Sequence, residues 1–366
     1  MESNTPTTRD ILRISLETDY AVQPFQKQHA FIIGINDYQY VSKLKTAVND
    51  AIRLGKILEE QHYHTVHPIC INPTAEVLRA FLENMKNVVG EKDSAMLYFA
   101  GHGMALDDDE GMNGYIVPTD AKVNNRNTLI PMSFLQACCE ALPCRHFLMI
   151  LDCCFAGSIR WATTKRDVDT HFLPKRIYKE RFERYLTDKA WQVLTSASYD
   201  QQAFDILKGF KNDRDNEGDV HSPFALTLFE ALAGKGDIVP DGGDGIITAT
   251  EMYLYLREQV ELPTLAVNMK MRQTPSIFTM PKHDKGEFIF FAPNHRLNLP
   301  PIPKNNPFKG LKSFNESDKE LFYGRDRVIQ ELLERVLSQK LTVVSGASGT
   351  GKSSLVKAGL IPQLRD

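Results

Sequence analysis

The stretch HFLMILDCC, residues 146–154, decides how this chain folds. A short, mostly apolar run of this length that ends in polar residues is typical of a strand buried on both faces of a sheet. The stretch SAMLYFAG, residues 94–101, is a second run of the same kind, and it leads directly into His102. Reactive groups of parallel sheets gather at the carboxyl ends of the strands, so we expect His102 and the Cys153–Cys154 pair to meet there.

Strand-like and helix-like segments alternate from residue 28 to residue 292. The predicted strands are 29–35, 94–101, 146–154 and 191–198, and the predicted helices are 44–61, 75–89, 132–142, 222–234 and 248–260. Thr74 and Ser222 are the candidate N-caps, and Gly234 is expected to end its helix. This order predicts an α/β fold with a mostly parallel sheet covered by helices on both faces.

Composition narrows the class of protein. The chain of 366 residues is 42% hydrophobic and 24% charged with a net charge of -3, which indicates a globular protein and gives no electrostatic case for nucleic acid or a membrane surface. No apolar run approaches the roughly 20 residues of a transmembrane helix. Six cysteines occur without metal-binding spacing, which favours reduced thiols and a cytoplasmic protein: Cys70, Cys138, Cys139, Cys144, Cys153 and Cys154.

Proline content marks a boundary late in the chain. Residues 293–306 carry four prolines without a periodic pattern, which is typical of a linker. We therefore predict an N-terminal extension (1–27), a main domain (28–292), a linker (293–306) and the start of a second domain (307–366). Within the main domain, 160–190 begins as a basic, polar segment and 212–219 is expected to be a solvated loop.

A histidine and a cysteine at neighbouring strand ends can form a nucleophilic pair. A cysteine nucleophile needs a base within hydrogen-bond reach, because the thiol is mostly protonated at neutral pH. His102 precedes Cys154 by 52 residues, close to the interval of about 50 that separates the two residues in caspases. The alternative is that His102 is an incidental residue in a turn at the end of a strand.

In order along the chain, six motifs resemble the caspase and metacaspase cysteine peptidases, above all the prokaryotic members. They are FIIGINDY, VNDAIRLGKIL, YFAGHGM, ILDCCFAGS, LTSAS and HSPFALTLFEAL. The resemblance implies that His102 is the general base and Cys154 the nucleophile, with the N–H groups of Gly103 and Cys154 as the oxyanion hole. Cys153 is then expected on the opposite face of the strand as a small buried hydrophobe, and the other four cysteines are read in the same way.

The same resemblance suggests the specificity. Asp152 stands two positions before Cys154, as in metacaspases, and Asp50 matches the second acid of the metacaspase pocket. Two carboxylates in a semi-buried pocket call for a cation, so cleavage after Arg or Lys in protein substrates is expected. The alternatives are a surface acid at position 50 and a caspase-like preference for Asp.

Two further segments bear on regulation. Self-cleavage in the basic segment is a hypothesis, with an ordinary surface loop as the alternative; the candidate positions are Lys165, Arg166, Lys175 and Arg176. Residues 237–251 invite comparison with a calcium-binding EF-hand loop, but that frame puts Pro240 and Gly242 where acids belong. A glycine-rich turn leading into a helix is therefore expected, with calcium binding as the less favoured alternative. No metal site is predicted, and the peptidase chemistry itself needs no cofactor.

Residues 341–360 contain a complete phosphate-binding loop pattern. Gly346, Gly351, Lys352 and Ser353 match it, after an expected strand and before an expected helix. With the lead-in 306–336, this segment resembles the start of STAND signalling NTPases, whose nucleotide is ATP with Mg²⁺. Thirteen residues follow Ser353, too few for a second strand with a Walker-B acid, so we expect weak nucleotide binding and no ATPase activity.

These patterns predict a peptidase effector domain joined to the start of a STAND domain. By resemblance alone, oligomerisation through a STAND or sensor region would switch the peptidase on in bacterial defence or programmed cell death. The rival reading is a proteolytically silent scaffold or switch module with the same fold. A second rival takes the nucleotide site as the main function.

Overall fold

The computed structural model describes most of the chain. The described residues are 25–62, 64–108, 111–154, 177–198, 201, 203–207, 220–240, 242–267, 272–293, 309, 312–346 and 349–365. The chain divides into two compact units, residues 1–300 and 301–366, and the division falls inside the 293–306 segment.

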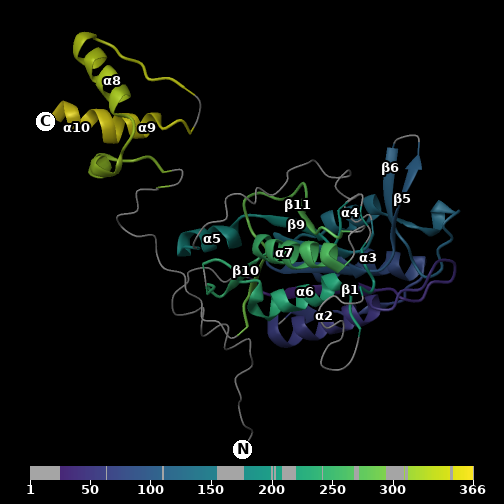
Figure 1. Cartoon of the computed structure of the whole chain (residues 1–366). Coiled ribbons are helices and arrows are strands. Elements are labelled where there is room, and N and C mark those ends of the chain that lie inside the picture. The colour runs from purple at the N-terminus through teal and green to yellow at the C-terminus, as the bar shows by residue number, and fades with distance from the viewer. Residues whose placement is uncertain are drawn as a thin grey trace, which may run out of the picture. The chain divides into compact units, whose positions relative to one another are not determined.

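A seven-stranded sheet forms the centre of the first unit in its described part (Figure 1). Its strands are β1 (Gln28–Gly34), β2 (Thr65–Val66), β3 (Cys70–Ile71), β4 (Ser94–Ala100), β8 (His146–Asp152), β9 (Ala190–Thr195) and β11 (Ser276–Thr279). Their order is β11-β9-β8-β4-β1-β2, with β3 also paired to β1. All pairs are parallel except that of β11 with β9, which confirms the predicted mostly parallel sheet.

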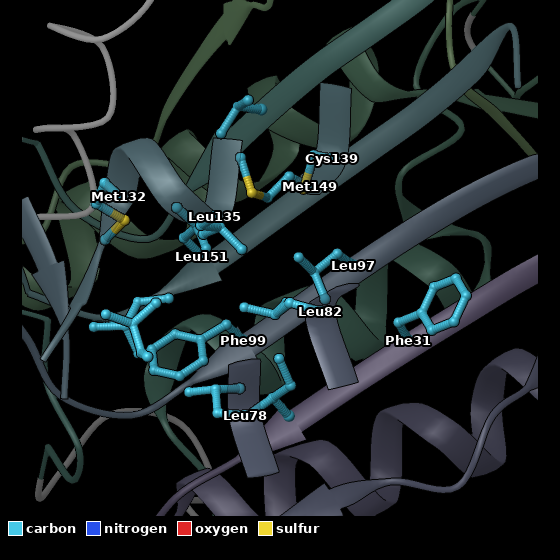
Figure 2. Close-up of a cluster of buried hydrophobic side chains, with 14 of the residues drawn as sticks. Phe31, Leu78, Leu82, Leu97, Phe99, Met132, Leu135, Cys139, Met149 and Leu151 are labelled. Carbon is cyan, nitrogen blue, oxygen red and sulfur yellow. The ribbon is translucent and has the colours of Figure 1, made fainter. Parts of the chain in front are cut away.

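Helices cover both faces of the sheet. The helices α3 (Ala75–Val88) and α4 (Met132–Glu140) pack on one face against Phe31, Leu97 and Phe99 (Figure 2). On the other face lie α2 (Ala47–His62), α6 (Pro223–Glu230) and α7 (Ala249–Val267), packed against Ile32 and Tyr98. Successive strand residues thus enter different cores, which is why these strands read as continuous apolar runs.

Local signals in the sequence set the ends of several helices. The Thr74 side chain accepts from the Val77 N–H at the start of α3, and the Ser222 hydroxyl accepts from the Ala225 N–H at the start of α6. After α6 comes a π-helical turn, Ala231–Lys235, in which Gly234 adopts a φ of 112°. A positive φ favours glycine, so the predicted end of this helix at Gly234 is confirmed.

Smaller elements complete the first unit. The strands β5 (Gly103–Asp108), β6 (Gly111–Ile116) and β7 (Ile130–Pro131) form an antiparallel sheet whose β5–β6 hairpin projects from the body (Figure 1). The helix α5 (Lys179–Thr187) lies within the 160–190 segment, and β10 (Ile246–Thr248) pairs with β12 (Ile289–Phe291). No helix in the described part of the chain combines the length and the apolar character that a membrane span requires.

The second unit is helical where it is described. Its elements are a 3-10 helix (Glu316–Leu321), α8 (Asp326–Ser338), α9 (Lys352–Ser354), a π-helical turn (Leu355–Leu360) and α10 (Ile361–Arg365). The strand expected just before the phosphate-binding loop is wrong: 341–346 forms no ladder in the described residues. Leu341 and Val343 are 77% and 76% exposed. A strand forms only where a neighbouring strand supplies hydrogen-bond partners, and among the described residues none does so for this segment.

Most of the contribution of α3 to the stability of the folded protein should come from its packing on the sheet. Leu82→Ala removes a side chain with 0% exposure from the cluster of Figure 2, so the free energy of unfolding should fall by about 2–5 kcal/mol. Val77→Ala, on the same helix at 52% exposure, should change it by less than about 0.5 kcal/mol. Urea unfolding measures both, and equal effects would contradict the assigned core face.

Candidate active site

The ladder between β4 and β8 builds the candidate site. Its register pairs each residue from Ser94 to Ala100 with one from His146 to Asp152, and Ala100 lies opposite Asp152. The Gly101 N–H continues the pairing with a 3.3 Å hydrogen bond to the Asp152 carbonyl. Since both strands end at the same level, His102 and Cys154 follow at one edge of the sheet, as the sequence predicted.

Two groups hold His102 in place. Its backbone N–H donates to the Tyr38 hydroxyl (2.7 Å), and the ring centroids of Tyr38 and His102 are 4.7 Å apart. Its Nε2 lies 2.8 Å from the Ser42 carbonyl oxygen. A carbonyl can only accept, so Nε2 carries the proton in this bond and the neutral ring keeps Nδ1 free to act as a base.

The two adjacent cysteines differ sharply in their surroundings. Cys153 is 1% exposed and belongs to the core that packs under α3 and α4, so the expectation of a small buried hydrophobe is confirmed. Cys154 is half-buried, and burial raises the pKa of its thiol. The sulfur lies 3.9 Å from the Ala203 carbonyl oxygen.

The remaining cysteines follow the prediction only in part. Cys139 and Cys144 are buried, as expected, whereas Cys70 and Cys138 are half-buried. Burial raises the pKa of all four thiols, so none of them is poised as a thiolate.

The glycines beside His102 allow the protein's own chain to approach closely. A Cβ on Gly103 would overlap the Cys154 carbonyl oxygen and lie 3.0 Å from the Cys153 sulfur. A Cβ on Gly101 would lie 2.8 Å from the Tyr38 hydroxyl oxygen. Glycine at position 103 therefore lets the histidine and cysteine segments pack together, and glycine at position 101 leaves room for Tyr38.

The backbone of Gly103 has a defined orientation. The Val117 N–H donates to the His102 carbonyl (3.1 Å), and Gly103 lies opposite Ile116. Because hydrogen-bonded and non-hydrogen-bonded pairs alternate in an antiparallel ladder, Gly103 belongs to a non-hydrogen-bonded pair. Its N–H therefore points away from β6.

Asp50 and Asp152 are joined through the residues that start α6. Asp50 is 1% exposed, its Oδ1 lies 2.7 Å from His221 Nδ1, and it accepts from the Ser222 N–H. The Ser222 hydroxyl donates to Asp152 Oδ2 (2.9 Å). Burial raises the pKa of both acids; for Asp152, burial and then the charge of Asp50 raise it to about 7.

One pocket gathers these groups. Its lining comprises Leu44, Thr46, Ala47, Asp50, Ala100, Gly101, His102, Asp152, Cys153, Cys154, Ala203, Phe204, Asp205 and Ser222. His102, Cys154, Asp50 and Asp152 thus line the same hollow, although they come from distant parts of the sequence.

Sequence reasoning missed several residues of this site. Asp205 brings a third carboxylate to the pocket, where it accepts from the Lys45 and Thr46 N–H groups and the Thr46 hydroxyl ahead of α2. His221, Ser42 and Tyr38 were missed as well. Only Tyr38 and His221 lay within quoted motifs, and nothing in their spacing indicated contacts with His102 or Asp50.

Two further segments singled out from the sequence are the basic segment and residues 237–251. Lys165, Arg166, Lys175 and Arg176 fall outside the described residues. In 237–251, Glu251 accepts from the Val239 and Thr248 N–H groups, and burial raises its pKa to about 8. Within the described residues, no cluster of three or more His, Cys, Asp or Glu side chains is arranged to hold a metal ion.

The phosphate-binding loop of the second unit has the backbone that the pattern requires. Gly346, Gly349 and Gly351 have φ values of 154°, 82° and 84°. Lys352 Nζ donates to the Gly346 carbonyl (2.8 Å), and Lys352 begins α9 as predicted. Glycine is favoured at these positive φ values, which accounts for glycine at the three positions.

Comparisons with known proteins agree with this geometry. The fold and the site define a caspase-like α/β protein carrying a STAND element. Residues 27–285 match the family model described as "Caspase domain", and residues 307–366 match the one described as "Novel STAND NTPase 1". The chain therefore belongs to the caspase-domain family, which is a family of peptidases.

Solved structures and curated proteins add little to this assignment. The chain resembles the crystal structure of protein GSU0716 from Geobacter sulfurreducens at 17% identity and a TM-score of 0.47, covering 74% of this chain and 100% of the other. A comparison with curated proteins finds no match.

Alkylation can test the different surroundings of Cys153 and Cys154. Iodoacetamide should modify the half-buried Cys154 and spare Cys153. The thiolate is the reacting form and burial raises the thiol pKa, so the rate should still be rising at a pH where a free cysteine is already ionised. The tryptic peptide 146–160, which holds both cysteines, reports the reaction by mass spectrometry.

Matched variants complete this test. Cys153→Ala should keep the modified peptide, and Cys154→Ala should lose it. Label that persists in Cys154→Ala would contradict the assignment of the accessible thiol.

Proposed function

We propose that this protein is a cysteine endopeptidase that cleaves protein substrates after arginine or lysine. The observation that carries the proposal is the shared pocket, in which His102 and Cys154 stand beside Asp50, Asp152 and Asp205. A nucleophile with an adjacent base performs acyl transfer, and a group of carboxylates favours a cationic side chain.

In the proposed reaction each group has one defined role. Cys154 transfers its thiol proton to Nδ1 of His102 as its sulfur bonds to the scissile carbonyl carbon. The carbonyl oxygen becomes an oxyanion that accepts from the N–H groups of Gly103 and Cys154. The imidazolium then protonates the leaving amine as the C–N bond breaks. Water, deprotonated by His102, hydrolyses the thioester and regenerates the thiol.

The Ser42 carbonyl supports the role of His102. By accepting from Nε2–H, it favours the tautomer with a free Nδ1 and stabilises the imidazolium that forms during the reaction. In the described residues the Cys154 sulfur is directed toward the Ala203 carbonyl oxygen. Productive binding therefore includes a rotation of the thiol from Ala203 to His102.

The acids supply the selectivity for a basic side chain. Asp152 stands two positions before the nucleophile in the chain, and its pKa of about 7 leaves it partly protonated in the free protein. A substrate guanidinium stabilises the carboxylate and can pair with it in a bidentate manner. Asp50 already contacts His221 and Ser222, so it contributes both charge and the position of Ser222.

The STAND element suggests how the peptidase is controlled. Gly346, Gly351, Lys352 and Ser353 would hold the phosphates of ATP, with Ser353 toward Mg²⁺. Nucleotide-dependent oligomerisation would then activate a cytoplasmic peptidase in bacterial defence or cell death, with self-cleavage between residues 165 and 176 as an accompanying step. The peptidase reaction itself uses neither the nucleotide nor calcium.

Fluorogenic peptides provide the direct test. Substrates that end in Arg or Lys before the fluorophore should be hydrolysed, because the pocket is acidic, whereas an Asp substrate should be cleaved at least about 100-fold more slowly. Calcium and ATP are each added and omitted in the same assay.

Variants of the pair serve as controls. Cys154→Ala and His102→Ala should abolish hydrolysis, and Cys153→Ala should retain most of it. Preferred cleavage after Asp would leave the Cys–His pair intact and contradict the acidic pocket. Hydrolysis of no substrate under any of these conditions would favour the scaffold reading.

The raised pKa of Asp152 predicts a pH-dependent selectivity. An acid with a pKa of about 7 is neutral at lower pH, so the preference for Arg over its neutral analogue citrulline should grow about tenfold from pH 5.5 to pH 8.5. The ratio of kcat/KM for the two substrates cancels the titration of the Cys–His pair. Asp152→Asn should flatten this ratio, and a ratio in the wild type that does not vary with pH would contradict the role of Asp152.

A further inference from the structure

The strand β5 has one edge without a partner strand. Its other edge pairs with β6, and in the described part of the chain no strand joins the antiparallel sheet beyond β5. Because Gly103 belongs to a non-hydrogen-bonded pair, the alternation of the ladder gives Ala105 and Asp107 the same orientation. The N–H and C=O groups of all three residues therefore point to the free edge.

The side chains along β5 keep this edge open. Gly103 and Ala105 are small, whereas Met104 and Leu106 pack against the core formed with α3 and α4. Their packing anchors the strand to the body, and the outer backbone groups have no partner strand in the described part of the chain. Natural proteins usually protect an edge of this kind with a charge, a bulge or a covering segment, and a binding site is a recurrent reason to leave it open.

The position of this edge relative to the acidic pocket indicates which molecule would bind to it. The acidic pocket, which would take the side chain before the scissile bond, is lined by His102 and Cys154 but by no residue of β5. The edge instead begins at Gly103, whose N–H is proposed to bind the oxyanion. A polypeptide that enters the pocket on one side of His102 and Cys154 thus continues toward β5 on the other.

We propose that β5 binds the residues that follow the scissile bond as an added β-strand, an inference that rests on the proposed peptidase function. Strand residues advance about 3.3 Å each, so two residues along β5 match two residues along the substrate. Ala105 then meets the second residue after the scissile bond, and Asp107 the fourth.

Two substrates distinguish binding along β5 from the cleavage reaction itself. One carries a coumarin amide directly after arginine, and the other carries the same residues before the bond and four residues after it. The longer peptide should show a kcat/KM at least about tenfold higher.

N-methylation of the substrate backbone identifies the edge itself. In an added strand only alternate N–H groups face the partner, so methylating one of the second and third amides after the scissile bond should lower kcat/KM about fivefold. Methylating the adjacent amide should change it less than twofold. Ala105→Pro, which removes one outward N–H, should reduce the advantage of the longer peptide over the coumarin substrate.

The outcomes are distinct. Cleavage of both substrates with no advantage of length, or an advantage insensitive to which amide is methylated, would overturn the role of β5 and leave the peptidase intact. A failure to cleave either substrate would overturn the proposed function and this inference together.

Discussion

The parallel ladder between β4 and β8 is the constraint on which the rest of the structure depends. Its register, Ser94 opposite His146 through Ala100 opposite Asp152, fixes where both strands end. A shift by one residue would reverse which side chains enter each core and would separate the two ends. Because alternate residues of both strands fill two different cores, the packing of α3 and α4 on one face and of α2, α6 and α7 on the other holds this register. The meeting of His102 with Cys154 is therefore a product of core packing.

Three carboxylates lie close together at the end of this ladder, an arrangement that is unfavourable without partners. Each of them is stabilised by specific hydrogen bonds. Asp50 is paired with His221, Asp152 accepts from Ser222, and Asp205 accepts backbone N–H groups ahead of α2. These bonds oppose the burial that raises the pKa of Asp50 and Asp152. The remaining shift means that one of the acids is partly protonated until a cation arrives, as expected of a site that is complementary to a charged ligand.

Much of this arrangement could be predicted from the sequence, and the same physical reasons explain which parts could not be predicted. The strands β1, β4, β8 and β9 are apolar runs that neither face exposes, so their positions could be predicted, and alternation correctly sent Cys153 into the core. The two-residue strands β2 and β3 and the edge strand β11 were not predicted. Asp205, Ser42 and Tyr38 lie in irregular segments, and their contacts join residues 60 to 160 positions apart, for which local periodicity holds no signal. The expected strand at 341–345 failed for a related reason: its apolar pattern favours a strand, but a strand forms only where another strand supplies the hydrogen bonds.

The contacts that the sequence did not reveal connect the two halves of the site. The segment that carries Ser42 approaches α2, where Asp205 accepts from the N–H groups of Lys45 and Thr46. Ser42 in turn accepts from His102, and the same segment as Asp205 places the Ala203 carbonyl beside the Cys154 sulfur. The wall of the acidic pocket, the support of the histidine and the contact of the thiol are thus parts of one hydrogen-bonded unit. Under the proposed function, a cation bound at Asp205 would therefore contact the same segments that hold His102 and Cys154.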